Sequence, residues 1–278
     1  MVDVLDACPP RHQCITDDGP CPLAPECAGK AKSRKPSGTS PTQVPGHITI
    51  DDAIALKTRV GSATWNAEML CLRPQRSGCV LPEFDEPVHT VDNLPPGADA
   101  WTWIAGMDFG IRSPTVVLFA ALDPSGVLWV ADEYIQTDTA LDAHVETIRA
   151  FAPAPQWIGV DPAGGQRANQ TGISDVQAMR NRGLRVRDRR LRLHEGLNLV
   201  RARLKPAAGG PRLYIRRSCQ RLIESMAKYH YPRDRPFADT PEKDGHDHCV
   251  DALRYMIQNL DMKFTAECEN YMHHNRGG

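Results

Sequence analysis

Residues 101–136 read "WTWIAGMDFGIRSPTVVLFAALDPSGVLWVADEYIQ", and this stretch decides the fold. It contains three runs of apolar and β-branched residues, and the turn Asp123-Pro124-Ser125-Gly126 separates the second run from the third. Such runs favour β-strands, and Asp, Pro, Ser and Gly between them favour tight turns. The stretch therefore predicts three consecutive antiparallel strands, the first of which ends at Asp108.

The residues that follow alternate between helical and strand patterns. Residues 139–152 place Leu141, Val145 and Ile148 on one helical face, and "QWIGV" (156–160) is a short apolar strand. We then expect helices at 172–183, 196–205, 219–231 and from about His246 to Leu260, and strands at 184–190 and 212–215. This order predicts an α/β protein with a mixed sheet and helices on its faces.

The chain before this pattern divides into three segments. Residues 1–30 hold four cysteines among prolines and polar residues, without helical or strand periodicity. Residues 31–45, "AKSRKPSGTSPTQVP", have the composition of a flexible linker. Residues 46–100 are expected to form a helical connector, with Asp51 as an N-cap. We therefore expect the main domain over residues 101–262, followed by a loose C-terminal tail at 263–278.

The composition argues against several classes of protein. Of the 278 residues, 41% are hydrophobic and 24% are charged, which is ordinary for a soluble globular protein. An apolar run of about 18 residues and a basic-then-apolar leader are both missing, which argues against a membrane span and a signal peptide. The nine cysteines show no secretory disulfide framework, so we expect a reducing, cytoplasmic environment.

Charge is unevenly distributed along a chain whose formal net charge is only −1. Residues 180–235 contain 17 Lys and Arg against four Asp and Glu, a local excess of +13. Such a segment suits a polyanion. A solvated arginine-rich surface without a partner explains it equally well.

Aspartates occur at expected strand ends and near the start of the last helix, where they would lie just outside the core in rigid positions. Asp108 ends one apolar strand and Asp161 ends another. Ligands usually bind at such strand ends in α/β sheets, although a simple turn would explain either residue alone. In "GHDHCVDALRY" (245–255), Asp247 falls in the first turn of the last helix, and Asp251 lies one turn later on the same face.

Three explanations of residues 245–255 remain open: a zinc site, a hard-cation site completed from elsewhere in the chain, or a helix cap. His246 and His248 are two residues apart and point to different sides of a helix, which counts against a shared zinc ion. If the fold brings Asp108, Asp161 and Asp247 together, their oxygens suit Mg²⁺ or Mn²⁺. Two such ions about 4 Å apart can activate water and stabilise the leaving oxygen of a phosphodiester.

Three stretches resemble the nuclease domain of the large terminase subunits of tailed phages, in the family's order and over residues 101–262. They are "IAGMDFG", "WIGVDPAGG" with "TGISDVQAMRNRGLRV", and "KDGHDHCVDALRY". The resemblance implies an RNase H-like fold, two divalent metal ions, and cutting of viral DNA during packaging into a capsid. By position it assigns metal binding and catalysis to Asp108, Asp161 and Asp247. Asp251 is a secondary candidate for the metal, and Glu133 is a further acid that could approach the same edge.

One departure from this family matters. A complete large terminase carries a GxxxxGK[ST] phosphate-binding loop, and this sequence has none. We therefore expect a metal-dependent endonuclease of double-stranded DNA without an ATPase motif, as a nuclease half, a split-gene product or a prophage remnant. The implied protein partners are a terminase ATPase, the small terminase subunit and the portal protein. The alternative is a non-catalytic DNA-binding or assembly module from a degraded prophage terminase.

Two more sets of candidate residues remain. The basic segment would contact DNA phosphates without reading sequence, through Arg185, Arg187, Arg189, Arg190, Arg192, Arg201, Arg203 and Lys205. Cys8, Cys14, Cys21 and Cys27 could hold a structural zinc ion, but the CxxC pairs typical of such sites are missing. Thiols that bind no metal explain the same pattern.

Overall fold

The computed structural model describes residues 7–9, 14–16, 19–33, 48–71, 78–110, 113–161, 174–232, 234, 235, 238 and 240–274. The chain forms two compact units: Met1–Gln75 with Lys205–Gly210, and Arg76–Leu204 with Pro211–Gly278. We call them the N-terminal unit and the sheet unit. Most of the linker expected at 31–45 lies outside the described residues.

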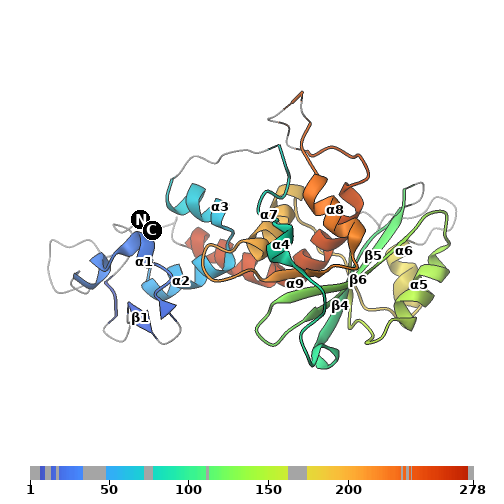
Figure 1. Ribbon diagram of the computed structural model, residues 1–278, viewed down its shortest axis with the longest axis horizontal. Coiled ribbons are helices and arrows are strands. Elements are labelled where there is room, and N and C mark those ends of the chain that lie inside the picture. The colour runs from blue at the N-terminus through green and yellow to red at the C-terminus, as the bar shows by residue number, and fades with distance from the viewer. Residues whose placement is uncertain are drawn as a thin grey trace. The chain divides into compact units, whose positions relative to one another are not determined.

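The sheet unit is built on a seven-stranded mixed sheet (Figure 1). Across the sheet the order is β3 (Thr90–Val91), β9 (Leu213–Arg216), β6 (Leu128–Gln136), β5 (Thr115–Leu122), β4 (Thr102–Asp108), β7 (Ile158–Val160) and β8 (Val186–Arg187). The central strands β4, β5 and β6 are antiparallel. The outer pairs on both sides are parallel. The predicted antiparallel meander and mixed sheet are therefore confirmed.

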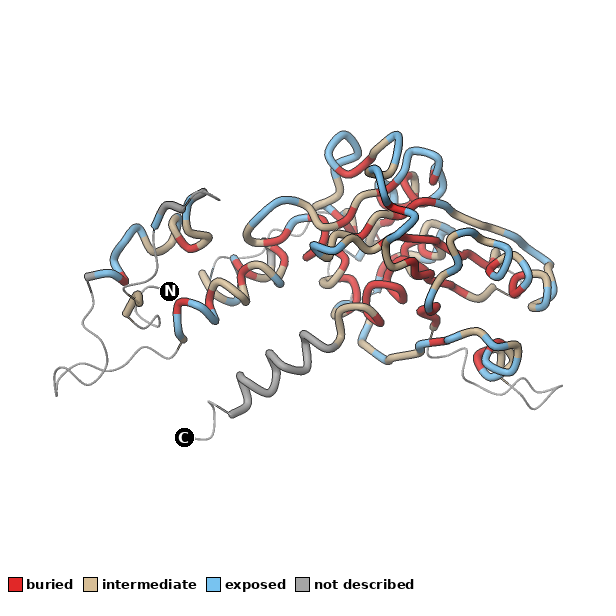
Figure 2. Tube along the Cα trace, turned by 90° about the horizontal axis from the view of Figure 1, so that it is seen from below, coloured by how far each residue is buried: buried red, intermediate tan, exposed pale blue. Residues whose placement is uncertain are grey.

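Helices cover both faces of this sheet. One face packs against α7 (Leu193–Leu204), α8 (Gln220–Lys228) and α9 (Asp247–His274). The other face packs against α5 (Leu141–Ala150) and α6 (Asp175–Asn181), which lie together in Figure 1. Central strands buried on both sides read as continuous apolar runs, and "TVVLFAAL" of β5 is such a run. In Figure 2 the buried residues gather in the interior of this unit.

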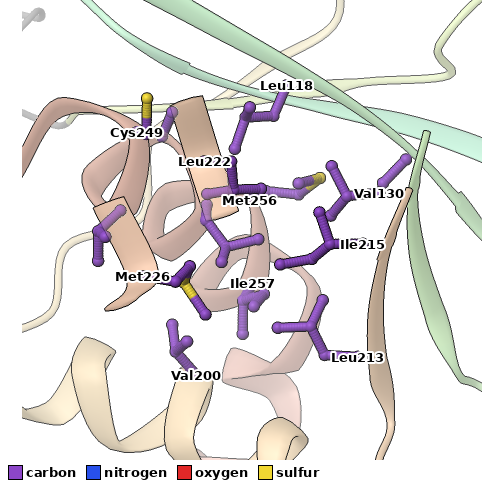
Figure 3. Packing of buried hydrophobic residues seen from close by; sticks show 14 of the residues in the cluster. Leu118, Val130, Val200, Leu213, Ile215, Leu222, Met226, Cys249, Met256 and Ile257 are labelled. Atoms are coloured by element: carbon purple, nitrogen blue, oxygen red, sulfur yellow. The ribbon is translucent and has the colours of Figure 1, made fainter. Parts of the chain in front are cut away.

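The core on the α7–α9 side shows how alternation along the strands selects the buried face. Leu118 and Val130 point from the sheet toward Leu222, Met256 and their neighbours on the helices (Figure 3). The next residues along the same strand turn to the other face, where Val117 and Phe119 pack with the α5–α6 core. Fully burying each side chain of this size contributes about 1.5–3 kcal/mol.

Helix α9 packs directly against the backbone of two strands. A Cβ atom at Gly106 of β4 would collide with the carbonyl of Ala252, and one at Gly159 of β7 would collide with the carbonyl of Tyr255. Only glycine permits so close an approach. The start of α9 is thereby brought to the ends of β4 and β7.

The structure differs from the sequence-based expectations at several element boundaries. Helix α9 continues to His274, where we expected an end near Leu260 and a loose tail. The strand expected at 184–190 is only two residues long. Residues 78–100 hold α4 (Glu86–His89), a 3₁₀ turn at Ala98–Ala100 and β3. They belong to the sheet unit because β3 pairs with β9. In the described ranges, no helix combines the length and apolarity needed to cross a membrane.

The N-terminal unit has little regular structure. Its elements are β1 (Ile15–Thr16), β2 (Gly19–Pro20), α1 (Ala24–Cys27), a 3₁₀ turn (Lys30–Ser33), α2 (Ile50–Arg59), α3 (Ser62–Thr64) and a π-helical turn (Trp65–Met69). The cap of α2 is Thr49, whose hydroxyl accepts the backbone N–H of Asp52, and not Asp51 as expected. Asp51 instead lies in the first helical turn.

Candidate active site

Two of the predicted acids lie at neighbouring strand ends. β4 and β7 are parallel and pair in register, with Met107 opposite Val160, so Asp108 and Asp161 come next on each strand. Met107 and Val160 both pack with the α5–α6 core. Because side chains alternate along a strand, Asp108 projects toward the opposite face, which α9 covers. The same register brings Asp161 next to it at this edge.

The first turn of α9 supplies the next acid. Asp247 is the first residue of the helix and is only 4% exposed, and its Oδ1 accepts the backbone N–H of Gly245 at 3.1 Å. His248 Nδ1 lies 2.9 Å from Asp108 Oδ2, which ties the start of α9 to the end of β4. A carboxylate at a helix N-terminus is also stabilised by the helix dipole.

Asp251 lies one helical turn beyond Asp247. Its Oδ1 accepts a hydrogen bond from Nε of Arg254 at 3.0 Å and forms an ion pair with Nη2 at 2.9 Å. Arg254 is itself buried and lies over the ring of Tyr255. The ion pair with Arg254 holds the Asp251 carboxylate in place.

Electrostatic coupling shows that the acids share one environment. Burial raises the pKa of Asp108 to about 6, and the charges of Asp251 and Asp161 add to the rise while His248 opposes it. Burial also raises the pKa of Asp251, with Asp247 and Asp161 adding to the rise and Arg254 opposing it. Asp251 therefore interacts with all three of the other acids. We call Asp108, Asp161, Asp247 and Asp251 the acid cluster.

The acid cluster has the donor chemistry of a hard-cation site. Carboxylate oxygens are the ligands that Mg²⁺ and Mn²⁺ prefer. Burial raises the pKa of Asp108 and of Asp251, and a cation would relieve the mutual repulsion that adds to this rise. As the side chains stand, however, no three His, Cys, Asp or Glu residues in the described part of the chain are spaced to hold a metal ion. The residues present fit such a cation in kind and in charge.

Glu133 and His246 have surroundings that differ from those of the acid cluster. Glu133 accepts the backbone N–H groups of Arg221 and Leu222, both at 2.9 Å, and so caps the start of α8. The Nδ1 atom of His246 is buried without a hydrogen-bond partner among the described atoms. Glu133 therefore supports α8, while His248 is the histidine in contact with the acid cluster.

A family model described as "Terminase RNaseH-like domain" matches residues 105–260, which is more than half of the chain. The chain belongs to this terminase nuclease family. Its α/β architecture, with a mixed sheet of seven strands and flanking helices, is consistent with the RNase H-like fold that the sequence predicted. The match also includes every residue of the acid cluster.

Solved structures agree with this fold. The large terminase of the thermophilic bacteriophage D6E, in complex with ADP, superposes with a TM-score of 0.60 at 18% identity. The match covers 77% of this chain and 55% of the D6E chain, so this terminase nuclease spans about half the length of that relative. The P22 large terminase nuclease domain gives a TM-score of 0.52 at 16% identity, with 66% of this chain and 93% of that chain covered.

The nuclease of the large terminase of phage G20c, solved with bound cobalt, has a TM-score of 0.48 at 13% identity. The match covers 66% of this chain and 98% of that one. A comparison with curated protein sequences finds no match.

The basic residues of this terminase nuclease fall into two groups. Arg185, Arg190 and Arg192 are exposed, and their side chains form no hydrogen bond or ion pair within the ranges that the structure describes. Arg187 is also exposed and lies over Trp157, with its guanidinium carbon 4.2 Å from the ring centroid. Both Arg185 and Arg187 line a hollow of about 330 Å³.

The second group is engaged inside the protein. Arg203 is 7% exposed, and its Nε and Nη2 each donate to a carboxylate oxygen of Asp261 at 2.7 Å. Arg201 donates twice to the carbonyl of Val80, at 3.0 and 2.7 Å. The sequence predicts that both residues contact DNA, but in the structure their guanidinium groups bind within the protein. Lys205 belongs to the N-terminal unit.

Two side-chain amides of α9 hold the backbone at Arg189. Neither was expected from the sequence. Gln258 Nε2 donates to the carbonyl of Arg189 at 2.8 Å, and the N–H of Arg189 donates to Asn259 Oδ1 at 3.1 Å. Gln258 is fully buried and Asn259 is 1% exposed. The available signal was a pair of polar residues in the middle of an apolar helix. The two bonds hold the backbone at Arg189 through its N–H and its carbonyl.

Proposed function

We propose that this chain is a metal-dependent endonuclease that hydrolyses phosphodiester bonds of double-stranded DNA. One observation carries the proposal: in a terminase nuclease fold, four acids from β4, β7 and α9 interact at one sheet edge. Acids that repel one another in a partly buried site cost stability, so their assembly argues for a ligand of opposite charge.

The acid cluster would hold Mg²⁺ or Mn²⁺, as two ions, with Asp108, Asp161 and Asp247 as the principal ligands and Asp251 beside them. When bound, such ions lower the pKa of water and neutralise charge at a phosphate. The protein supplies the orientation. His248 holds one oxygen of Asp108, and Arg254 holds one oxygen of Asp251. Side chains fixed in this way lose little entropy when a cation binds.

DNA would lie along the segment that follows β8. β7 and β8 are parallel, so the chain after Arg187 emerges at the same sheet edge as Asp161. Arg190 and Arg192 lie on this segment, and Arg185 and Arg187 lie at β8 itself. Arginine contacts with phosphate position a duplex without reading its sequence. We therefore propose weak sequence preference at this surface.

A complete packaging reaction needs an ATPase, and this sequence lacks the phosphate-binding loop. We propose a terminase ATPase, the small terminase subunit and the portal protein as its protein partners. The second candidate, a non-catalytic DNA-binding module from a degraded terminase, shares the fold and the basic surface. The two candidates differ only in whether the acid cluster supports cleavage.

Nicking of supercoiled plasmid DNA tests the proposal. We expect the wild-type chain to nick with Mg²⁺ or Mn²⁺ and to stop when EDTA is added. Asp161→Asn should lower the rate at least about 100-fold, since it replaces a ligand charge. Asp99→Asn, at an exposed turn, is the matched control and should cut like wild type. Folded wild-type protein that binds DNA but does not nick it with either metal would favour the non-catalytic module.

A further inference from the structure

The cysteines of the N-terminal unit lie outside the proposed nuclease site. Cys14 and Cys21 flank the hairpin of β1 and β2, in which Ile15 pairs with Pro20 and Thr16 with Gly19. The N–H of Cys21 donates to the carbonyl of Cys14 at 2.9 Å, which extends the ladder by one pair. Residues directly opposite in such a ladder have Cβ atoms about 4.5–5.5 Å apart on one face. The hairpin therefore presents two thiols together.

Ala31 joins the other two cysteines. Its carbonyl accepts the backbone N–H of Cys8 at 3.0 Å, and its own N–H donates to Sγ of Cys27 at 3.5 Å. Cys27 ends helix α1. Ala31 therefore holds the sulfur of Cys27 close to the backbone of Cys8.

All four thiols share one environment. Cys8, Cys21 and Cys27 pack against the buried cluster that contains Leu23 and Ala31. Burial raises the pKa of the Cys8 thiol; Cys14, Cys27 and Cys21 each add to the rise, while Lys32 opposes it. All four cysteines are free thiols in the structure.

The described part of the N-terminal unit has a small fully buried core. Its buried hydrophobic cluster consists of five residues among those described: Leu23, Ala31, Ile50, Ala53 and Trp65. One ion pair, between Lys57 and Glu26 at 2.7 Å, adds a buried link. Small units with so few apolar residues usually need a disulfide or a metal ion to fold stably.

We propose that Cys8, Cys14, Cys21 and Cys27 bind one structural zinc ion. Four thiolates fill the tetrahedral coordination that zinc takes in structural sites. The hairpin supplies one pair of ligands, and Cys8 and Cys27, linked through Ala31, supply the other. The thiols gather without yet having the spacing of a metal site in the described structure. Zinc binding therefore requires the four sulfur atoms to move closer together than they lie in the structure.

Metal content of the full chain tests this proposal independently of any nuclease activity. Protein purified without chelators should contain about one zinc ion per chain by mass spectrometry, and a mercurial reagent should release it. Cys14→Ser and Cys21→Ser should lose most of this zinc. Cys71→Ser is the matched control, because Cys71 is an exposed cysteine of the same unit, and it should retain the ion. Asp161→Asn should also retain it, which separates this site from the acid cluster.

Cobalt(II) gives a second readout if a serine variant fails to fold. Added to the metal-free wild-type chain, it should produce the charge-transfer and d–d absorption bands of tetrahedral thiolate coordination. The proposal is overturned if the folded wild-type chain binds no zinc, either as purified or when zinc is added to the metal-free chain. It is also overturned if Cys14→Ser and Cys21→Ser retain the zinc content of wild type. Cobalt bands typical of oxygen ligands alone would also overturn it.

Discussion

The acid cluster and the exposed arginines at β8 are both groups of like charge in the sheet unit, but the protein holds them in opposite ways. Asp108 and Asp247 are 7% and 4% exposed, and burial raises the pKa of Asp108 to about 6. Arg185, Arg190 and Arg192 are exposed to solvent. The interaction between two exposed charges is largely screened by salt when they are more than about 10 Å apart, whereas buried charges are screened much less.

This difference in burial affects what each charged group can bind. The acids are held by side-chain contacts, such as His248 with Asp108 and Arg254 with Asp251, and they keep a net repulsion that a cation would relieve. The backbone at Arg189 is held by Gln258 and Asn259, and the side chains of Arg185, Arg190 and Arg192 remain exposed. The first arrangement favours tight binding of a small ion. The second favours weak, salt-sensitive contact with an extended polyanion.

The largest expected effect separates two acids of the same helix. Asp247→Asn should lower the nicking rate at least about 100-fold and leave the melting temperature in EDTA unchanged or raised, because it removes one of several repelling charges. Asp251→Asn breaks the ion pair with buried Arg254 and should cost about 1–3 kcal/mol of unfolding free energy. Nicking rates and thermal melts of both variants measure the contrast. If Asp251→Asn is the stable, inactive variant and Asp247→Asn still cuts, the roles are reversed.

An intermediate effect is expected at the exposed arginines. Replacing Arg185, Arg190 and Arg192 by Gln should weaken DNA binding and flatten its salt dependence, by about 0.9 in log–log slope for each phosphate that the variant no longer neutralises. Filter binding between low and moderate salt gives both quantities. Arg149→Gln, an exposed arginine on α5, should leave the slope unchanged. An unaltered slope in the triple variant would place the DNA surface elsewhere.

The smallest effect concerns pH. The pKa of Asp108 is raised above its ordinary value to about 6, so its protonated form favours folding. This contribution is fully present below the ordinary carboxyl pKa and is lost as the pH rises through about 6. In EDTA, the unfolding free energy of wild type should fall by about 1–2 kcal/mol relative to Asp108→Asn between pH 4.5 and 7.5. Chemical denaturation at several pH values measures this difference. If wild type and Asp108→Asn lose the same unfolding free energy over this range, the pKa of Asp108 is not raised in the folded protein.

The sequence by itself determined the local elements and much of the candidate site. Apolar runs predicted β4, β5 and β6, and the helical pattern at 172–183 predicted α6. There the Ser174 hydroxyl accepts the N–H of Gln177, and Gly183 has a φ of +82°. These signals are local, because propensity, caps and turns depend on neighbours in sequence. The placement of Asp108 and Asp161 at strand ends followed from them.

Only the tertiary structure decided which charges are used and which remain available. Arg203 and Arg190 look alike in the sequence, yet Arg203 meets Asp261, 58 residues away, and Arg190 meets no partner in the described ranges. Asp251 joins the acid cluster because α9 packs on Gly106 and Gly159, which brings it to the ends of β4 and β7. The physical reason is range: hydrogen bonds and charge coupling depend on distance in space, and contacts made by chain folding carry no periodic signal in the sequence.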